Sequence, residues 1–178
     1  MRCRSRNFRA CWEFNGLIEP IARNFSPMKQ LNWKALVLFG VLNFAALAIG
    51  GLFTGPGVQS GWYANLNQAP WIPPGATFGI AWTVVMLSLT VFMGQTQPRH
   101  PRRLYLWYAI QWVLNVAWNP LFFETKLPDL ALLDLVLLFA SVLMMWRFCK
   151  RGGWWIVPYV AWLVVATSLN VWVVLFNP

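Results

Sequence analysis

The chain has 178 residues, of which 58% are hydrophobic and 11% are charged. The 64 positions from Ala35 to Pro98 contain no Asp, Glu, Lys, Arg or His, which excludes an ordinary water-soluble domain because such a domain needs charged side chains on its surface. The net charge of +9 does not indicate nucleic-acid binding, because the basic residues flank apolar runs instead of forming one basic face. We therefore predict an integral membrane protein.

The first 28 residues differ from the rest of the chain. They are polar, Arg-rich and irregular, and they lack the apolar region of a signal peptide. Met28 followed by Lys29 resembles a natural start just before the first apolar run. We interpret residues 1–28 as a disordered extension or a misassigned start, and residues 29–178 as one transmembrane domain.

Five apolar segments are each close to the roughly 20 residues that a helix needs to cross a bilayer. In chain order they cover residues 31–54, 76–96, 104–123, 130–148 and 154–176. Helices are predicted because backbone groups in lipid must be satisfied internally and because the apolar runs are continuous instead of alternating. The expected fold class is an all-α membrane protein, a five-transmembrane-helix bundle with a long structured first extramembrane loop.

The first connection, from Gly55 to Gly75, is uncharged and contains Trp62, Tyr63 and Trp71 among several Gly and Pro residues. A long loop in a compact domain is usually functional or disordered, and the aromatic residues argue against disorder. We expect this loop to fold over the outer end of the bundle as a lid. Gly75 also forms a GxxxG pattern with Gly79, which is a weak signal of helix dimerisation.

The basic residues predict the orientation of the chain. In a five-span arrangement, 13 of the 14 Lys and Arg residues fall on one side of the membrane and only Lys126 falls on the other. The positive-inside rule then places the N-terminus inside and the C-terminus outside.

Polar residues in the third predicted span lie on one helical face. Gln111, Asn115 and Trp118 are spaced i, i+4 and i+7. Amides are costly in lipid, so this face should turn inward. Two readings are open: a pocket for a flat, mostly apolar ligand, or amides that bond between helices while the Trp rings fill space.

Two other spans contribute similar residues. Trp162, Ala166 and Leu169 repeat the same spacing in the fifth span, with Asn170 beside them, and Trp82 lies in the second span next to Thr83. These residues extend the candidate pocket to three spans.

Asp134 lies within the fourth predicted span, where an acidic residue is by default a functional candidate. We favour a structural role for it near the interface, paired with Lys126 or capped by water. Pro120 and Pro158 fall within predicted spans, and each can kink its helix because it removes a backbone donor.

No sequence pattern indicates conventional catalysis or metal binding. His100, the only histidine, lies between two prolines in a basic connection, which favours a loop residue over a haem ligand. Cys3, Cys11 and Cys149 show neither a disulfide framework nor zinc-ligand spacing. No nucleophilic triad can be assembled, and GxGxxG, Walker and HExxH patterns are absent from the sequence. We expect no catalytic residue of these types, no metal site and no obligatory cofactor.

Four sequence blocks together resemble the TspO/MBR family, the translocator proteins. They are WYANLNQAPWIPPGATFGIAWT (62–83), QWVLNVAWNPLFF (111–123), LALLDLVLL (130–138) and PYVAWLVVATSLN (158–170). The blocks occur in the family's order, and the resemblance covers about residues 31–176.

The resemblance implies a five-helix bundle, usually a homodimer, whose members bind porphyrins and haem and, in animals, sterols beneath the first loop. Carried over by motif, the ligand contacts are Tyr63, Trp82, Gln111, Asn115, Trp118, Trp162, Ala166 and Leu169. The sequence departs from the family at Gln68–Ala69, where Lys-Pro is usual, and after Asn170, where the Tyr and Arg of the animal sterol motif are missing. Sterol binding through that motif is therefore not expected, and such motifs are weak signals in any case.

The main functional hypothesis is a membrane translocator or sensor that binds a tetrapyrrole in a lidded apolar pocket. One alternative is a light-dependent porphyrin-degrading enzyme, with Tyr63, Trp82 and Trp162 as the candidate electron donors. Another is a small-molecule transporter, against which the chain shows no strong internal repeat. The expected partners are a tetrapyrrole or another flat apolar molecule, the lipid bilayer and a second copy of the chain, with no nucleic acid.

Overall fold

The computed structural model describes residues 32–95, 101–148 and 153–177, and within these ranges it contains helices and no strand. The predicted extension (residues 1–28), His100 and Cys149 lie outside the described residues. The elements are α2 (Trp33–Val58), α3 (Gly61–Ala64), α4 (Gly75–Gln95), α5 (Pro101–Asn119), the π-helical turn η1 (Pro120–Glu124), α6 (Pro128–Arg147), the 3₁₀ turn η2 (Gly153–Ile156) and α7 (Val157–Phe176).

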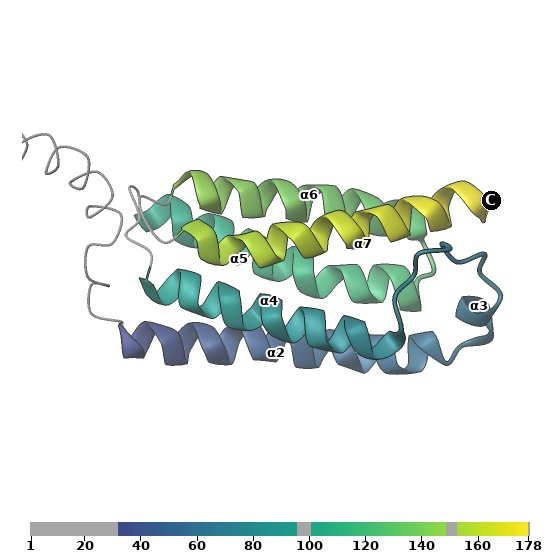
Figure 1. Ribbon diagram of the computed structural model, residues 1–178, viewed down its shortest axis with the longest axis horizontal. Helices are drawn as coiled ribbons and strands as arrows, with labels where there is room; N and C mark the ends of the chain where they lie inside the picture. Colours follow the sequence, from purple (N-terminus) through teal and green to yellow (C-terminus); the bar gives the residue numbers. More distant parts are fainter. Residues whose placement is uncertain (1–31, 96–100, 149–152, 178) are drawn as a thin grey trace, which may run out of the picture. The chain divides into compact units, whose positions relative to one another are not determined.

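The five long helices pack in a closed ring. Going round the ring, α2 contacts α4, α4 contacts α7, α7 contacts α6, α6 contacts α5, and α5 returns to α2. Successive long helices run in opposite directions (Figure 1). The middle of the ring is a hydrophobic core in which Leu89, Phe92, Tyr159 and Leu163 are fully buried.

Four segments of the described chain are long and apolar enough to cross a membrane. They are residues 33–58, 75–95, 128–147 and 153–176, which correspond to four of the five predicted spans. α5, the third predicted span, is not among them. Its first turn carries Arg102 and Arg103, and Gln111 and Asn115 lie further along it, so it is less apolar than its neighbours.

Two helix boundaries differ from the predictions. α2 continues to Val58 with Pro56 inside it, so the first residues of the predicted loop are helical. Pro158 lies in the first turn of α7, where a missing N–H removes no bond within the helix, so it does not interrupt the helix in the way that we considered. Pro120 does interrupt its helix, because α5 ends at Asn119 and the chain continues as the wider turn η1.

A buried asparagine holds three helices together at one end of the ring. Asn43 of α2 is 1% exposed. Its Nδ2 donates to Thr90 Oγ1 of α4 at 2.9 Å, and its Oδ1 accepts from the Tyr108 hydroxyl of α5 at 2.8 Å. Gly94 of α4 packs so closely on α2 that an added Cβ would stand 2.6 Å from Leu36 Cδ2. At this end, α2 and α4 are therefore in tight contact.

Candidate ligand-binding site

A cavity of about 800 Å³ lies at the opposite end of the ring, where α2 ends and α4 begins. This volume is within the ~300–1,000 Å³ that is usual for small-molecule sites. Its wall comes from α2, α4, α5, η1 and α7, and the connection between α2 and α4 covers it with Tyr63, Leu66, Gln68, Ala69, Ile72 and Pro73. The lining is mostly apolar and aromatic with a few amides, which suits a large apolar ligand that carries polar substituents.

The structure brings six of the eight predicted contact residues together around this cavity. They are Tyr63, Trp82, Asn115, Trp118, Ala166 and Leu169. The other two do not line it. Gln111 is 2% exposed and lies in the core of the ring, and Trp162 lines a separate groove. Gly75 and Gly79, considered above as a dimerisation signal, also line the cavity.

Tyr159 organises the amides of α5. Its buried hydroxyl oxygen accepts one hydrogen bond from Gln111 Nε2 at 2.8 Å and another from Asn115 Nδ2 at 2.9 Å. Asn115 also reaches the cavity wall, whereas Gln111 does not. The interhelical reading is therefore realised, because Asn115 joins α5 to α7, and the same residue also lines the cavity. Sequence reasoning missed Tyr159, although a Tyr inside an apolar span is itself a signal, since its hydroxyl needs a buried partner.

Trp118 is oriented by a second set of hydrogen bonds. Its Nε1 donates to Asn170 Oδ1 at 3.1 Å, and Asn170 Nδ2 donates to the carbonyl oxygen of Pro128 at 3.0 Å. Its ring stacks on Phe122 with a centroid distance of 5.0 Å. The hydrogen bond at Nε1 and the stacking on Phe122 therefore fix the orientation of the indole, which forms a rigid aromatic part of the cavity wall.

The π-helical turn η1 supplies two neighbouring aromatic residues to the same wall. The Thr125 N–H donates to the Pro120 carbonyl at 2.9 Å, which closes the wide turn. Phe122 and Phe123 are both buried and both line the cavity. Such turns recur at functional sites. α2 passes close to this turn at Gly57, where any side chain would overlap the Phe123 ring.

The connection between α2 and α4 closes the end of the ring near the C-terminal end of α7 (Figure 1). The Asn67 N–H donates to Asn177 Oδ1 at 2.7 Å, and Asn177 Nδ2 donates back to the Asn67 carbonyl at 3.2 Å. Trp71 Nε1 donates to Ser168 Oγ at 3.3 Å. We call these four residues the loop latch, because they tie the connection to α7.

Tyr63 lies on the inner side of this connection. Its ring packs against Phe123 with a centroid distance of 5.7 Å, and the Ser60 Oγ accepts from its backbone N–H at 3.2 Å. Burial raises the pKa of the Tyr63 hydroxyl above its ordinary value, because the charged form is desolvated. The side chain therefore stays neutral at physiological pH and can both donate and accept a hydrogen bond.

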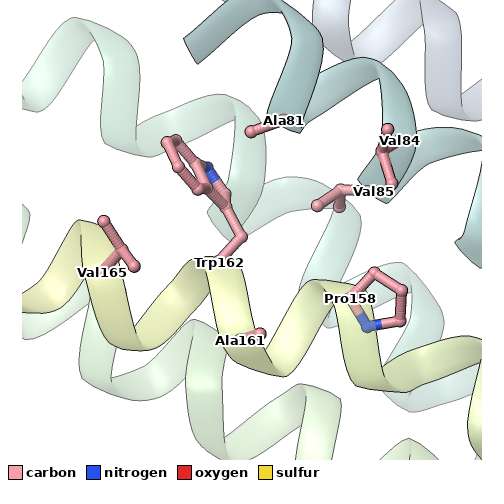
Figure 2. Close-up of a pocket in the computed structure, with 7 residues that line it drawn as sticks. All are labelled: Ala81, Val84, Val85, Pro158, Ala161, Trp162 and Val165. Atoms are coloured by element: carbon pink, nitrogen blue, oxygen red, sulfur yellow. The ribbon is translucent and has the colours of Figure 1, made fainter. Parts of the chain in front are cut away.

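Trp162 lines a smaller groove of about 280 Å³ between α4 and α7. Figure 2 shows Ala81, Val84 and Val85 of α4 on one side of the groove and Pro158, Ala161, Trp162 and Val165 of α7 on the other. The Trp162 ring also contacts Phe78 and Trp82, with centroid distances of 5.5 and 6.4 Å. Because Phe78 and Trp82 line the cavity, Trp162 lies one layer behind the cavity wall.

Asp134 does not form the ion pair with Lys126 that we considered for it. It is 5% exposed within α6, and within the described residues it forms no ion pair with Lys126 and its Oδ2 has no hydrogen-bond partner. Lys126 is exposed in the turn before α6, with a φ of 55°. The two residues are about two helical turns apart along the chain, too far for the expected pair.

The sequence matches the TspO/MBR family over residues 37–175. The chain belongs to the TspO/MBR family. Protein CrtK of Rhodobacter capsulatus is 32% identical over 155 residues, which cover 81% of this chain and 95% of that protein. The tryptophan-rich sensory protein of Cereibacter sphaeroides is 35% identical over 61% of this chain and 72% of its own length. The translocator protein of Bos taurus is 32% identical over 78% of this chain and 87% of its own length.

Family membership and the four apolar helices together identify a multi-pass membrane protein. Three of the four blocks that resemble TspO/MBR sequences contribute residues to the cavity lining, whereas the block at residues 130–138 contributes none. The first block contributes Tyr63 and Trp82, the second Asn115 and Trp118, and the last Ala166 and Leu169.

The loop latch predicts a local effect of Asn177→Ala. This change removes both hydrogen bonds to the Asn67 backbone, so the amides of residues 60–73 should exchange with deuterium roughly fivefold faster, the scale for about 1 kcal/mol of lost hydrogen bonding. Hydrogen exchange with mass spectrometry in nanodiscs measures the effect. Asn65→Ala, an exposed change outside the latch, is the control. Equal acceleration in both variants would mean that the latch does not hold the loop.

Proposed function

We propose that this TspO/MBR protein is a membrane translocator or sensor that binds a tetrapyrrole, a porphyrin or haem, in the 800 Å³ cavity. The observation that carries the proposal is the set of rigid aromatic rings around one covered space: Phe78, Trp82, Trp118, Phe122 and Phe123. Flat conjugated ligands stack on such rings, and the names of the sensory and translocator relatives agree with a role in sensing or translocation.

The polar groups of the cavity fit the edge of a tetrapyrrole. Tyr63, Gln68 and Asn115 lie around the apolar lining and can hydrogen-bond to carboxylate or amide-like substituents. Among the lining residues that the structure describes there is no His, Cys or Met. Recognition of haem would therefore depend on its ring and its substituents instead of on one of these residues as an iron ligand.

A side-by-side titration tests this proposal. Protein in nanodiscs is titrated in the dark with protoporphyrin, haem and a sterol, and tryptophan fluorescence reports binding. We expect saturable binding of a tetrapyrrole that Ala166→Trp abolishes, because Ala166 lines the cavity and the indole would fill it. Val164→Trp, on an exposed face of the same helix, should bind normally. If neither tetrapyrrole binds saturably, or if both variants bind like the wild type, the proposal is wrong.

We also propose that α5 is a fifth span. Its 19 residues correspond to about 28 Å of helix at 1.5 Å per residue, close to the roughly 30 Å hydrocarbon core. It packs between α2 and α6, both of which are candidate spans. Its polar residues Gln111 and Asn115 face the protein interior, so they are shielded from lipid.

The proposed topology has its N-terminus inside and its C-terminus outside. α5 begins with Arg102 and Arg103 and α6 ends with Arg147, whereas Lys126 lies in the turn at the other ends of these two helices. A reporter fused after Pro178 should therefore be active on the outer side, and a fusion truncated after Gln95 should be active on the cytoplasmic side. A cytoplasmic C-terminal reporter would contradict this topology.

One observation favours light-dependent degradation of bound porphyrin as a second candidate function. The Trp82 ring at the cavity wall lies within 6.2 Å of the Tyr159 ring and 6.4 Å of the Trp162 ring, so aromatic side chains connect the cavity with the core. Tyr63→Phe should then slow the loss of porphyrin absorbance under light more than it weakens binding in the dark, because it removes a hydroxyl and keeps the ring. Absorbance spectra before and after illumination measure this difference. Equal photolysis in the variant and the wild type would exclude a role for that hydroxyl.

A further inference from the structure

The wall of the cavity contains glycines at the boundary between α2 and α4. On α2, the lining residue Gly50 turns toward α5, because an added Cβ would stand 2.6 Å from Asn119 Nδ2. On α4, Phe78 and Trp82 turn toward Trp162 of α7. The other lining residues at this boundary therefore lie on the side of each helix that faces the other helix. They are Gly51 on α2 and Gly79 and Thr83 on α4.

These three residues, which we call the α2/α4 gap, line the cavity and are also solvent-exposed. At Gly51 and Gly79, no heavy atom of the described chain beyond the immediate helix backbone lies within 4 Å of where a Cβ would stand. Exposure of all three lining residues together with open space at both glycines is what an opening of the cavity between the two helices would produce. α2 and α4 lie next to each other (Figure 1) and are in tight contact at Asn43 and Gly94, so the opening belongs to their other end.

The surroundings of the gap are apolar. It lies within two helices that are apolar enough to cross the membrane, and Leu52 and Ile80 beside it are 73% and 66% exposed. Its only polar side chain is already satisfied, because the Thr83 hydroxyl donates to the Gly79 carbonyl at 2.8 Å. By contrast, the loop latch holds the connection down over the end of the cavity that faces water.

We propose that the α2/α4 gap is a lateral portal through which the ligand enters the cavity from the bilayer. This inference rests on the proposed function for the identity of the ligand. It specifies the substrate class further, as an apolar molecule that is already dissolved in the membrane. Glycine is required in the gap because any longer side chain would narrow the passage.

Association kinetics test the portal. Protoporphyrin is first partitioned into liposomes that contain the wild type, Gly79→Leu or Gly51→Leu, and stopped-flow tryptophan quenching is recorded. We expect the association rate of both variants to fall by about tenfold or more, and the dissociation rate to fall with it, because a blocked path slows passage in both directions. Gly55→Leu is the matched control. Gly55 lies on α2, as Gly51 does, and like Gly51 and Gly79 it has open space where a Cβ would stand, but it does not line the cavity. Unchanged rates, or a weaker Kd with an unchanged association rate, would overturn the portal.

A second measurement does not depend on porphyrin. Ala166→Cys places a thiol in the cavity of a protein whose native Cys3, Cys11 and Cys149 are replaced by Ser. A bilayer-soluble maleimide should label it about tenfold more slowly when Gly79→Leu is added, whereas Gly55→Leu should leave the labelling rate unchanged. Labelling that is unaffected by Gly79→Leu overturns the portal. If the portal variants slow labelling and the wild type binds no porphyrin, the proposed function fails while the portal stands.

Discussion

Tyr159→Phe is expected to destabilise the folded protein by about 2–6 kcal/mol, the largest stability effect we predict for one atom. The change leaves two donors, Gln111 Nε2 and Asn115 Nδ2, without their shared acceptor. Leaving a buried polar group unsatisfied costs about 1–3 kcal/mol, and lipid around the helices supplies no replacement partner. Unfolding of the purified protein in mixed detergent micelles, followed by circular dichroism, measures the loss.

Tyr105→Phe is the matched control for this change. Tyr105 lies on α5 and is 52% exposed, so removal of its hydroxyl should change the unfolding free energy by less than about 0.5 kcal/mol, as is usual for surface positions. Similar losses in the two variants would show that the bonds to Tyr159 contribute no more than an exposed hydroxyl.

Trp82→Ala is expected to weaken porphyrin binding by about 1–3 kcal/mol, the scale for removing an aromatic platform beneath a base or a similar flat ring. Trp82 lines the cavity and is held edge-on against Tyr159 and Trp162, so its ring is already oriented before a ligand arrives. Titration with protoporphyrin in nanodiscs, at matched protein stability, measures the change in affinity.

Two other tryptophans separate ligand contact from general packing. Trp33 is 66% exposed on α2, and Trp33→Ala should leave the affinity unchanged. Trp162 lies behind the cavity wall, so Trp162→Ala should weaken binding less than Trp82→Ala does, although the family resemblance implies that both residues touch the ligand. If Trp162→Ala has the larger effect, the ligand lies in the groove between α4 and α7 and not in the cavity.

Sequence reasoning predicted the helices well, because lipid imposes two local requirements. A helix that crosses the membrane must be apolar for about 20 residues, and every backbone group must find a partner within it. The apolar runs therefore located all five long helices to within a few residues. The spacing of Gln111, Asn115 and Trp118 predicted an inward face correctly, because each residue in a helix is rotated by a constant angle from the one before.

The sequence by itself determined that this is an all-helical membrane protein of the TspO/MBR family and which face of α5 turns inward. Only the tertiary structure decided which inward side chain meets the cavity, because helical spacing fixes a face but not the neighbour that the face meets. Asn115 reaches the cavity while Gln111, one turn away, is buried against Tyr159 of α7. Trp162 lies behind Trp82, and Asn43, which no motif marked, joins α2 to α4 and α5. The proposed portal at Gly51 and Gly79 likewise depends on the order of the helices around the ring, in which α2 lies next to α4.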